Sequence, residues 1–188
     1  MESGVITPDT KPTPTSNYGK SKLEAEKMCL ESGISARIAR CFAFTGPHLA
    51  LDIHFAIGNF IRNGLEQQDI IIKGDGTPLR SYLYADDLVK WLFSICDHPE
   101  NNAVFNVGSP EGISIAELAR RVAACFAPGP QIRILTPPVP GTPPAVYVPD
   151  TDKIRKTLGV TIENDLDTSI RKTIRFHQRS LFRQATLP

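Results

Sequence analysis

Hydrophobic positions along the chain follow two spacings, and stretches of one kind alternate with stretches of the other. The helical spacing is clearest near the C-terminus, where Leu166, Ile170 and Ile174 stand at i, i+4 and i+8. This spacing and its flanking polar residues predict helices over residues 18–31, 54–63, 86–96, 115–126, 151–158 and 166–178. Short apolar runs between them predict strands over residues 36–44, 70–73, 80–84, 103–107 and 132–135.

Capping and turn residues mark where several of these elements begin and end. Ser16 is the expected N-cap of the first helix, and Ser114 with Glu117 forms a capping box for the helix over 115–126. The first seventeen residues contain three prolines and residues 137–149 contain six, so both segments are expected to be extended loops. Strands that alternate with helices are typical of an α/β fold with parallel strands, although such a sheet usually contains more strands than this chain provides.

The composition is that of an ordinary globular protein. Of the 188 residues, 41% are hydrophobic and 22% are charged, which is enough apolar material for a core. Lys and Arg number 21 against 20 Asp and Glu, and no basic run with interleaved aromatics occurs, so we expect no binding to nucleic acid. No apolar run reaches membrane-spanning length, and residues 1–4 lack the basic and apolar regions of a signal peptide. We therefore expect a cytoplasmic protein that does not bind membranes.

Cysteine and histidine positions argue against disulfide and metal chemistry. Cys29, Cys41, Cys96 and Cys125 are scattered without a C-x-x-C spacing, and three of them stand among apolar neighbours, so we expect buried free thiols. The histidines at positions 48, 54, 98 and 177 show no ligand spacing with one another or with a cysteine. No metal site is therefore expected.

The strongest chemical signal is the pair Tyr18 and Lys22, which lie four residues apart on the first predicted helix. Residues at this spacing project from one face, so a phenol and an ammonium group stand side by side. A phenol ionises near pH 10, and use as a base near pH 7 requires about 4 kcal/mol of stabilisation of the phenolate. One positive charge at ~4 Å supplies on the order of 4 kcal/mol at an effective dielectric constant of about 20. Taken alone, the pair is a weak signal and is more typical of a solvated helix surface.

The surroundings of the pair resemble a known family. Residues 12–26, PTPTSNYGKSKLEAE, are similar nearly position by position to the catalytic segment of extended short-chain dehydrogenases/reductases, the NAD-dependent epimerase/dehydratase family. Residues 40–47 look like the family's R-x-F-N-x-x-G-P, and residues 74–87 look like its G-D-G-x-x-x-R-D-x-x-Y-V-x-D. Shorter matches occur at residues 106–108, 152–154 and 158–159, so the resemblance covers nearly the whole chain.

The resemblance implies roles for residues that match the family's motifs. Tyr18 would exchange a proton with a sugar hydroxyl as acid/base, while Lys22 would favour its phenolate and hold the nicotinamide ribose, so both would contact NAD. Arg80 would clamp the diphosphate of a nucleotide sugar, a use suited to a planar, permanently charged group. An ion pair between Arg80 and Asp86 or Asp87 is the alternative.

Two further residues carry weaker expectations. Asn59, on the second predicted helix, is a candidate for the substrate pocket or a solvated helix residue. Asp87 is expected to cap or brace its helix.

The chain also departs from the family pattern. Ala43 stands where the family usually has Asn, so a polar contact near the substrate or nicotinamide is lost or supplied elsewhere. Residues 139–144 lack the Arg that many relatives place near this loop. No Gly-x-x-Gly-x-x-Gly follows a strand, so the pyrophosphate cradle at a helix N-terminus is missing. The family's catalytic Ser or Thr would precede Met1.

Residues 1–188 are therefore expected to form the C-terminal part of such an enzyme, without its glycine-rich NAD-binding half. The implied fold is the last part of a Rossmann-type parallel sheet with a small α/β substrate-binding lobe. The implied cofactor is NAD, the implied partner is a nucleoside-diphosphate sugar, and the intact enzyme is expected to be a homodimer. The leading assignment is similar to dTDP-glucose 4,6-dehydratase; a UDP-sugar 4-epimerase and a non-catalytic nucleotide-sugar-binding remnant are the alternatives.

Overall fold

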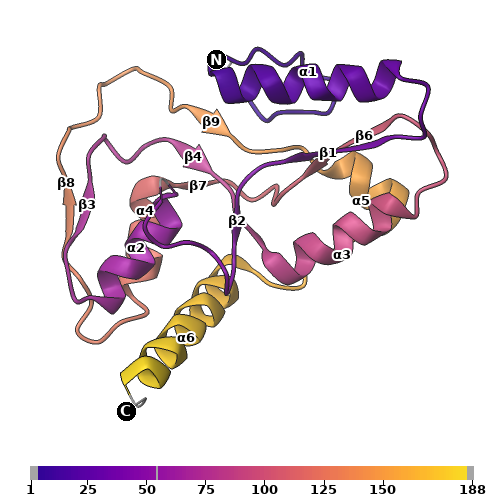
Figure 1. Cartoon of the computed structure of the whole chain (residues 1–188). Coiled ribbons are helices and arrows are strands. Elements are labelled where there is room, and N and C mark those ends of the chain that lie inside the picture. The colour runs from indigo at the N-terminus through magenta and orange to yellow at the C-terminus, as the bar shows by residue number, and fades with distance from the viewer. Residues whose placement is uncertain (1–3, 54, 186–188) are drawn as a thin grey trace.

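The computed structural model describes residues 4–53 and 55–185, and it confirms an α/β fold with parallel strand pairs (Figure 1). The helices are α1 Asn17–Glu31, α2 Ala56–Leu65, α3 Ala85–Cys96, α4 Ile115–Ala123, α5 Asp152–Leu158 and α6 Leu166–Ala185. The strands are β1 Arg37–Cys41, β2 Phe44–Thr45, β3 Ile70–Ile72, β4 Leu79–Arg80, β5 Leu83–Tyr84, β6 Ala103–Val107, β7 Ile113–Ser114, β8 Ile132–Ile134 and β9 Val146–Tyr147.

One half of the molecule is built on the parallel pair β1 and β6, whose register sets Arg37 opposite Ala103 and Cys41 opposite Val107. Helix α1 lies on one side of this pair, and α3 and α5 lie on the other (Figure 1). The side with α3 and α5 holds a core that includes the fully buried Trp91, Phe105 and Ile154.

The other half is a smaller lobe in which β3 pairs with β8 in parallel, and β4 lies between antiparallel β7 and parallel β9. Helices α2, α4 and α6 cover these strands around a second core that includes Ile57, Ile61, Leu118, Val122 and Ile170. Ile170 and Ile174 are both buried there, so the helical spacing read from the sequence is confirmed.

The predicted strand over 36–44 is divided into β1 and β2, and the predicted strand over 80–84 into β4 and β5. Each divided segment pairs with different partners before and after the break: β2 pairs with β5, whereas β1 pairs with β6 and β4 with β7 and β9. The amide of Leu83 donates to the carbonyl of Ala43 at 3.0 Å. This hydrogen bond joins the chain just before β2 to the start of β5. Both segments are apolar before and after the break, so the hydrophobic pattern alone does not show where either strand is divided.

Element ends also differ from the predictions in places. Within the described residues α2 starts at Ala56, and the predicted start at position 54 lies outside them. Helix α4 ends at Ala123 because a turn follows, and α6 continues to Ala185, beyond the predicted residue 178. Ser16 and Ser114 cap α1 and α4 as predicted, each accepting a backbone N–H at 3.1 Å. Two short strands, β7 and β9, were not expected, and β9 lies inside the proline-rich segment.

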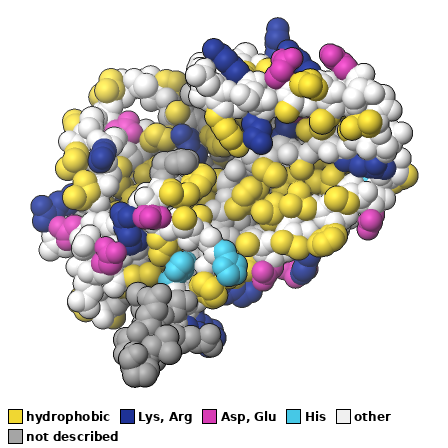
Figure 2. All heavy atoms as spheres, viewed as in Figure 1, with side chains coloured by type: hydrophobic (Ala, Val, Ile, Leu, Met, Phe, Trp, Pro, Cys, Tyr) yellow, Lys and Arg dark blue, Asp and Glu magenta, His cyan; other side chains and the backbone are white. Residues whose placement is uncertain are grey.

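The four cysteines are free thiols as predicted, but the prediction that they are buried is wrong. Cys41 and Cys96 are exposed, because each is the last residue of its element, where packing against the core ends. Hydrophobic side chains also gather at the surface across the middle of the face shown in Figure 2. None of the helices in the described part of the chain has the length and apolar character needed to cross a membrane.

Candidate functional site

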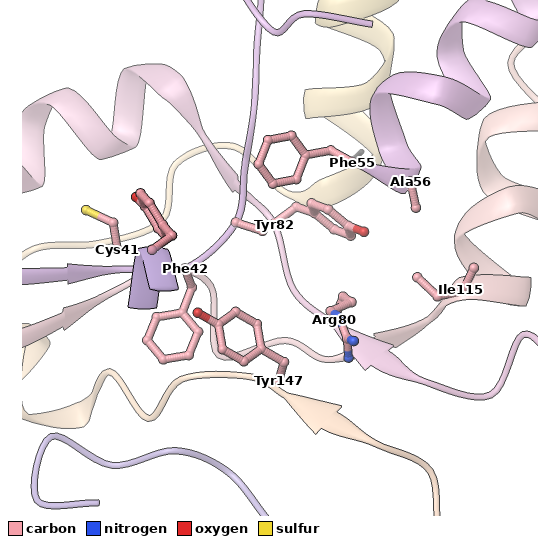
Figure 3. A pocket seen from close by; sticks show the side chains of 10 residues that line it. Cys41, Phe42, Phe55, Ala56, Arg80, Tyr82, Ile115 and Tyr147 are labelled. Atoms are coloured by element: carbon pink, nitrogen blue, oxygen red, sulfur yellow. The ribbon is translucent and has the colours of Figure 1, made fainter. Parts of the chain in front are cut away.

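A cavity of about 760 Å³ lies between the β1–β6 half and the smaller lobe. Its wall is assembled from α1, the end of β1, the start of α2, β4, α4 and β9. In Figure 3, the side chains of Arg80, Tyr82 and Tyr147 lie around one space, with Cys41 and Phe42 on one side and Ala56 and Ile115 on the other. Tyr18 and Arg80, predicted from distant sequence motifs, both line this cavity.

Tyr18 and Lys22 lie side by side on α1, as their spacing predicts. The Nζ atom of Lys22 is 5.6 Å from the centroid of the Tyr18 ring. Tyr18 is 74% exposed at the cavity edge, while Lys22 is not part of the described cavity wall. The phenol is therefore accessible to a bound molecule and has an ammonium group over its ring.

Helix α1 is held against β1 by a residue that the sequence analysis did not single out. Arg40 donates from Nη2 and Nε to the two carboxylate oxygens of Glu26 at 2.6 and 3.0 Å, and from Nη1 to the carbonyl of Pro8 at 2.6 Å. The hydrogen bond with Glu26 raises the pKa of Arg40. Glu26 stands one helical turn beyond Lys22 on α1, so this ion pair fixes the helix face that carries Tyr18 and Lys22.

Arg80 lies on β4 with its guanidinium in the cavity wall. Nη1 donates to the carbonyls of Leu79 at 2.7 Å and Ala145 at 3.4 Å, and the guanidinium carbon is 5.9 Å from the centroid of the Tyr147 ring. Among the described residues, Arg80 forms no salt bridge, so the alternative ion pair with Asp86 or Asp87 is not observed. Asp87 is fully buried and accepts hydrogen bonds from Asn164, bracing α3 against the segment before α6.

Asn59 is placed on α2 outside the cavity wall that the structure describes. Its amide nitrogen donates to the carbonyls of Ile53 at 2.7 Å and Phe55 at 3.1 Å. The side chain therefore supports the start of α2 and is not brought together with Tyr18 and Arg80.

Two phenols in the wall, Tyr82 and Tyr147, were missed by the sequence analysis. Tyr82 is only 7% exposed, and burial raises its pKa to about 12, opposed by the positive charge of Arg80. Burial also raises the pKa of Tyr147, whose ring packs on Phe42 with a centroid separation of 4.8 Å. The two-residue spacing from Arg80 could have identified Tyr82, since it places both on one side of an extended chain. Tyr147 lies in the proline-rich segment and had no comparable signal.

The wall is otherwise apolar apart from the Cys41 thiol, and it includes Ala43, the position where the resemblance led us to expect Asn. Among the residues that the structure describes, no group of three or more His, Cys, Asp or Glu side chains is arranged to hold a metal ion. His54, one of the histidines considered above, lies outside the described residues.

Comparison with known proteins gives the chain a family context. The family model described as NAD dependent epimerase/dehydratase family matches residues 3–108. UDP-glucuronic acid decarboxylase 1 of Xenopus tropicalis is 28% identical over 176 residues, which cover 92% of this chain. These residues are 41% of the decarboxylase, so the chain spans about two fifths of the length of such curated relatives.

Solved structures share the fold. MoeE5, in complex with UDP-glucuronic acid and NAD, is 27% identical with a TM-score of 0.80 over 94% of this chain and 60% of its own. MoeE5 has also been solved with UDP-glucose and NAD. A dTDP-glucose 4,6-dehydratase from Bacillus anthracis, in complex with NAD, has a TM-score of 0.83 over 95% of this chain and 57% of its own. At 18% identity, that likeness concerns the fold alone.

Proposed function

The chain belongs to the NAD-dependent epimerase/dehydratase family, and we propose that it supplies the catalytic tyrosine and the nucleotide-sugar pocket of an enzyme that oxidises a UDP-sugar. One observation carries this proposal: Tyr18, with Lys22 beside it, and Arg80 meet at a single cavity. The activity is proposed for a protein in which residues 1–188 form the C-terminal part and a glycine-rich dinucleotide-binding unit forms the rest. Such a unit supplies most of the dinucleotide affinity in this fold.

Tyr18 is proposed as the acid/base. Its exposed side chain, as the phenolate, can take the proton of a sugar hydroxyl and, as the phenol so formed, later return it. The positive charge of Lys22 stabilises the phenolate that must be present before the first of these transfers. The chemistry that NAD supplies when bound is the acceptance and return of a hydride. The exposed pair fits the nicotinamide ribose end of such a cofactor, which Lys22 would hold by hydrogen bonding to the ribose.

Arg80 is proposed to bind the diphosphate. Its position in the wall and its freedom from a described carboxylate partner leave a permanent positive charge facing the cavity. Carbonyl contacts to Leu79 and Ala145 fix the guanidinium plane without neutralising it. Asn59, held by local contacts at the start of α2, is proposed only as an indirect support of the pocket.

The nucleotide is proposed to be UDP. Relatives above 25% identity act on or hold UDP-glucuronic acid or UDP-glucose, whereas the dTDP-glucose dehydratase supports the fold alone. We therefore place a UDP-sugar ahead of the dTDP-glucose 4,6-dehydratase-like assignment. A nucleotide-sugar-binding module without turnover is the second candidate for the 188 residues themselves, favoured by their lack of a glycine-rich cradle.

Calorimetric titration of the 188-residue chain with UDP and with dTDP tests this function. UDP should bind, and Arg80→Ala should weaken its binding by about 1.5–3 kcal/mol, the range for hydrogen bonds to a charged group. Arg133→Ala is a matched control, because Arg133 lies on β8, pairs with Asp69 and is outside the described cavity wall. Absence of UDP binding, or equal affinity in Arg80→Ala, would contradict the proposal.

A further inference from the structure

The two halves of the molecule have separate apolar cores and meet at a polar junction. Ile162 packs against the core of the β1–β6 half, whereas Leu166 packs against the core of the lobe, so the chain crosses between the halves near Asn164. In Figure 1, α6 begins beside the start of α3 at this crossing. Asp87 and Asn164 are only 0% and 9% exposed there. Hydrogen bonds between buried polar groups, and not a shared apolar core, therefore join the halves at this point.

The segment before the crossing is anchored on α3. Trp91 donates from its indole Nε1 to the carbonyl of Thr161 at 3.0 Å. The carboxylate of Asp87 accepts from the backbone N–H of Asn164 at 3.0 Å and from its side-chain amide at 3.1 Å. Asn164 is therefore held to the β1–β6 half by two hydrogen bonds to a buried charged group.

Lys172 on α6 binds back to this anchored residue. Its Nζ atom donates to Oδ1 of Asn164 at 2.6 Å and lies 5.0 Å from the centroid of the buried Tyr84 ring. The Asn164 amide thus stands between a carboxylate and an ammonium group, and hydrogen bonds in such a chain strengthen one another. Ile170 and Ile174, on the same helix, are buried in the core of the lobe. The bond between Lys172 and Asn164 therefore spans the junction.

A second polar contact across the junction is weaker. The hydroxyls of Thr45 on β2 and Thr173 on α6 are both buried and lie 3.4 Å apart. The bond from Lys172 to Asn164 is shorter and its donor is charged, which makes it the stronger of the two. Removal of the Lys172 ammonium should therefore loosen this side of the junction.

The candidate site depends on how the halves are joined, because Tyr18 lies on α1 beside β1, whereas Arg80 lies on β4 of the lobe. Resting on the proposed function, in which a nucleotide sugar extends from Arg80 to Tyr18, we infer that Lys172 is a positioning residue. Its bond to Asn164 fixes the angle between the halves and thereby the separation of Arg80 and Tyr18. Lys172 lies outside the described cavity wall, so it acts through the junction and not by contact with substrate.

Pulsed electron paramagnetic resonance of the 188-residue chain measures the junction without any ligand. One spin label is attached to the exposed Cys96 on α3 and one to Ala124→Cys at the end of α4, after the other three cysteines are replaced by serine. Lys172→Met keeps the length of the side chain and removes its charge, and it should broaden the distribution of label distances by about twofold or more. Lys172→Arg should restore most of the narrow distribution. Lys156→Met is the matched control, because the pair of Lys156 with Asp152 lies within α5.

Denaturant unfolding of the same variants separates positioning from simple stabilisation. If Lys172→Met unfolds more easily but keeps label distances as narrowly distributed as in wild type, Lys172 only stabilises the fold and the inference is refuted. The same conclusion follows if Lys156→Met broadens the distribution as much as Lys172→Met does.

Two functional measurements connect the junction to the site. UDP should bind Lys172→Met within twofold of wild type, because the proposed phosphate contact, Arg80, lies within the lobe. In the protein carrying its dinucleotide-binding half, kcat for a UDP-sugar should fall by about tenfold or more, since small displacements of reacting groups are costly. An unchanged kcat in a variant with a broadened distribution would contradict the link to the site. If UDP binds neither protein, the proposed function fails, while the label distances still decide whether Lys172 fixes the angle between the halves.

Discussion

The ion pair between Arg40 and Glu26 leads to the sharpest structural prediction. Helix α1 carries Tyr18, yet none of its residues is buried, so apolar packing does little to fix its orientation. Two charge-assisted hydrogen bonds to Glu26 and one to the carbonyl of Pro8 hold it instead. Arg40→Ala removes all three, and it should release α1 while leaving the lobe built on β3, β8 and α4 intact.

The magnitude follows from burial and geometry. The side chains of Arg40 and Glu26 are 24% and 15% exposed, so solvent screens this pair less than it screens a surface pair. Hydrogen bonds to charged groups contribute about 1.5–3 kcal/mol, and these bonds share one side chain and do not add fully. Loss of Arg40 also leaves the Glu26 carboxylate partly buried without its partner. We expect the free energy of opening of α1 to fall by about 2–4 kcal/mol. The lower figure, about 2 kcal/mol, corresponds to a roughly 30-fold larger equilibrium constant for opening.

Amide hydrogen exchange of the 188-residue chain measures this opening directly. In Arg40→Ala, protection of α1 amides should fall by roughly 30-fold or more, while β3 and α4 amides keep theirs. Arg133→Ala is the control, since Arg133 has 62% side-chain exposure and its pair with Asp69 is expected to contribute about 1 kcal/mol or less. A double-mutant cycle with Glu26→Gln isolates the pair. Protection of α1 within twofold of wild type in Arg40→Ala would refute the reasoning.

Two further predictions concern the isolated chain. Without a glycine-rich cradle, the 188 residues should bind NADH far more weakly than an intact family member, and they should self-associate because hydrophobic side chains gather at the surface (Figure 2). The missing half of the sheet is expected to leave Ile38, Phe42 and Val107 partly uncovered; Ile38 and Phe42 are partly exposed, whereas Val107 is buried. A monomer by light scattering that binds NADH at low micromolar concentration would contradict both predictions. Burial raises the pKa of Tyr82 to about 12, so its stabilising effect is complete below about pH 10 and is lost as the pH rises through about 12. Denaturant unfolding should therefore show a smaller loss of stability over this range in Tyr82→Phe than in wild type, and equal losses would argue against a buried neutral phenol.

Local features of the fold were largely predictable from the sequence. Side-chain caps and helical spacing depend on residues within a few positions of each other, which is why Ser16, Ser114 and the Ile170–Ile174 spacing were identified correctly. The approach of Lys22 to Tyr18 belongs to the same class, because helix geometry alone sets it.

Features that depend on distant partners were not predictable in this way. The breaks after β1 and β4 arise because neighbouring residues pair with strands far away in the sequence. Tyr147 enters the cavity wall only because β9 pairs with β4, and the proline-rich sequence around it indicates no strand. The contact of Arg40 with Glu26 likewise requires α1 to fold back onto β1, and neither residue signals it alone.

The central claim is that Tyr18 performs proton transfer at a nucleotide-sugar site. Turnover of a UDP-sugar by Tyr18→Phe, measured in the protein carrying its dinucleotide-binding half, tests this claim most directly. We predict that kcat falls by about 10²–10⁴-fold while affinity for the UDP-sugar stays within a few-fold, since only the proton transfer is lost. Turnover retained within about tenfold of wild type would contradict the account and remove Tyr18 from its proposed role.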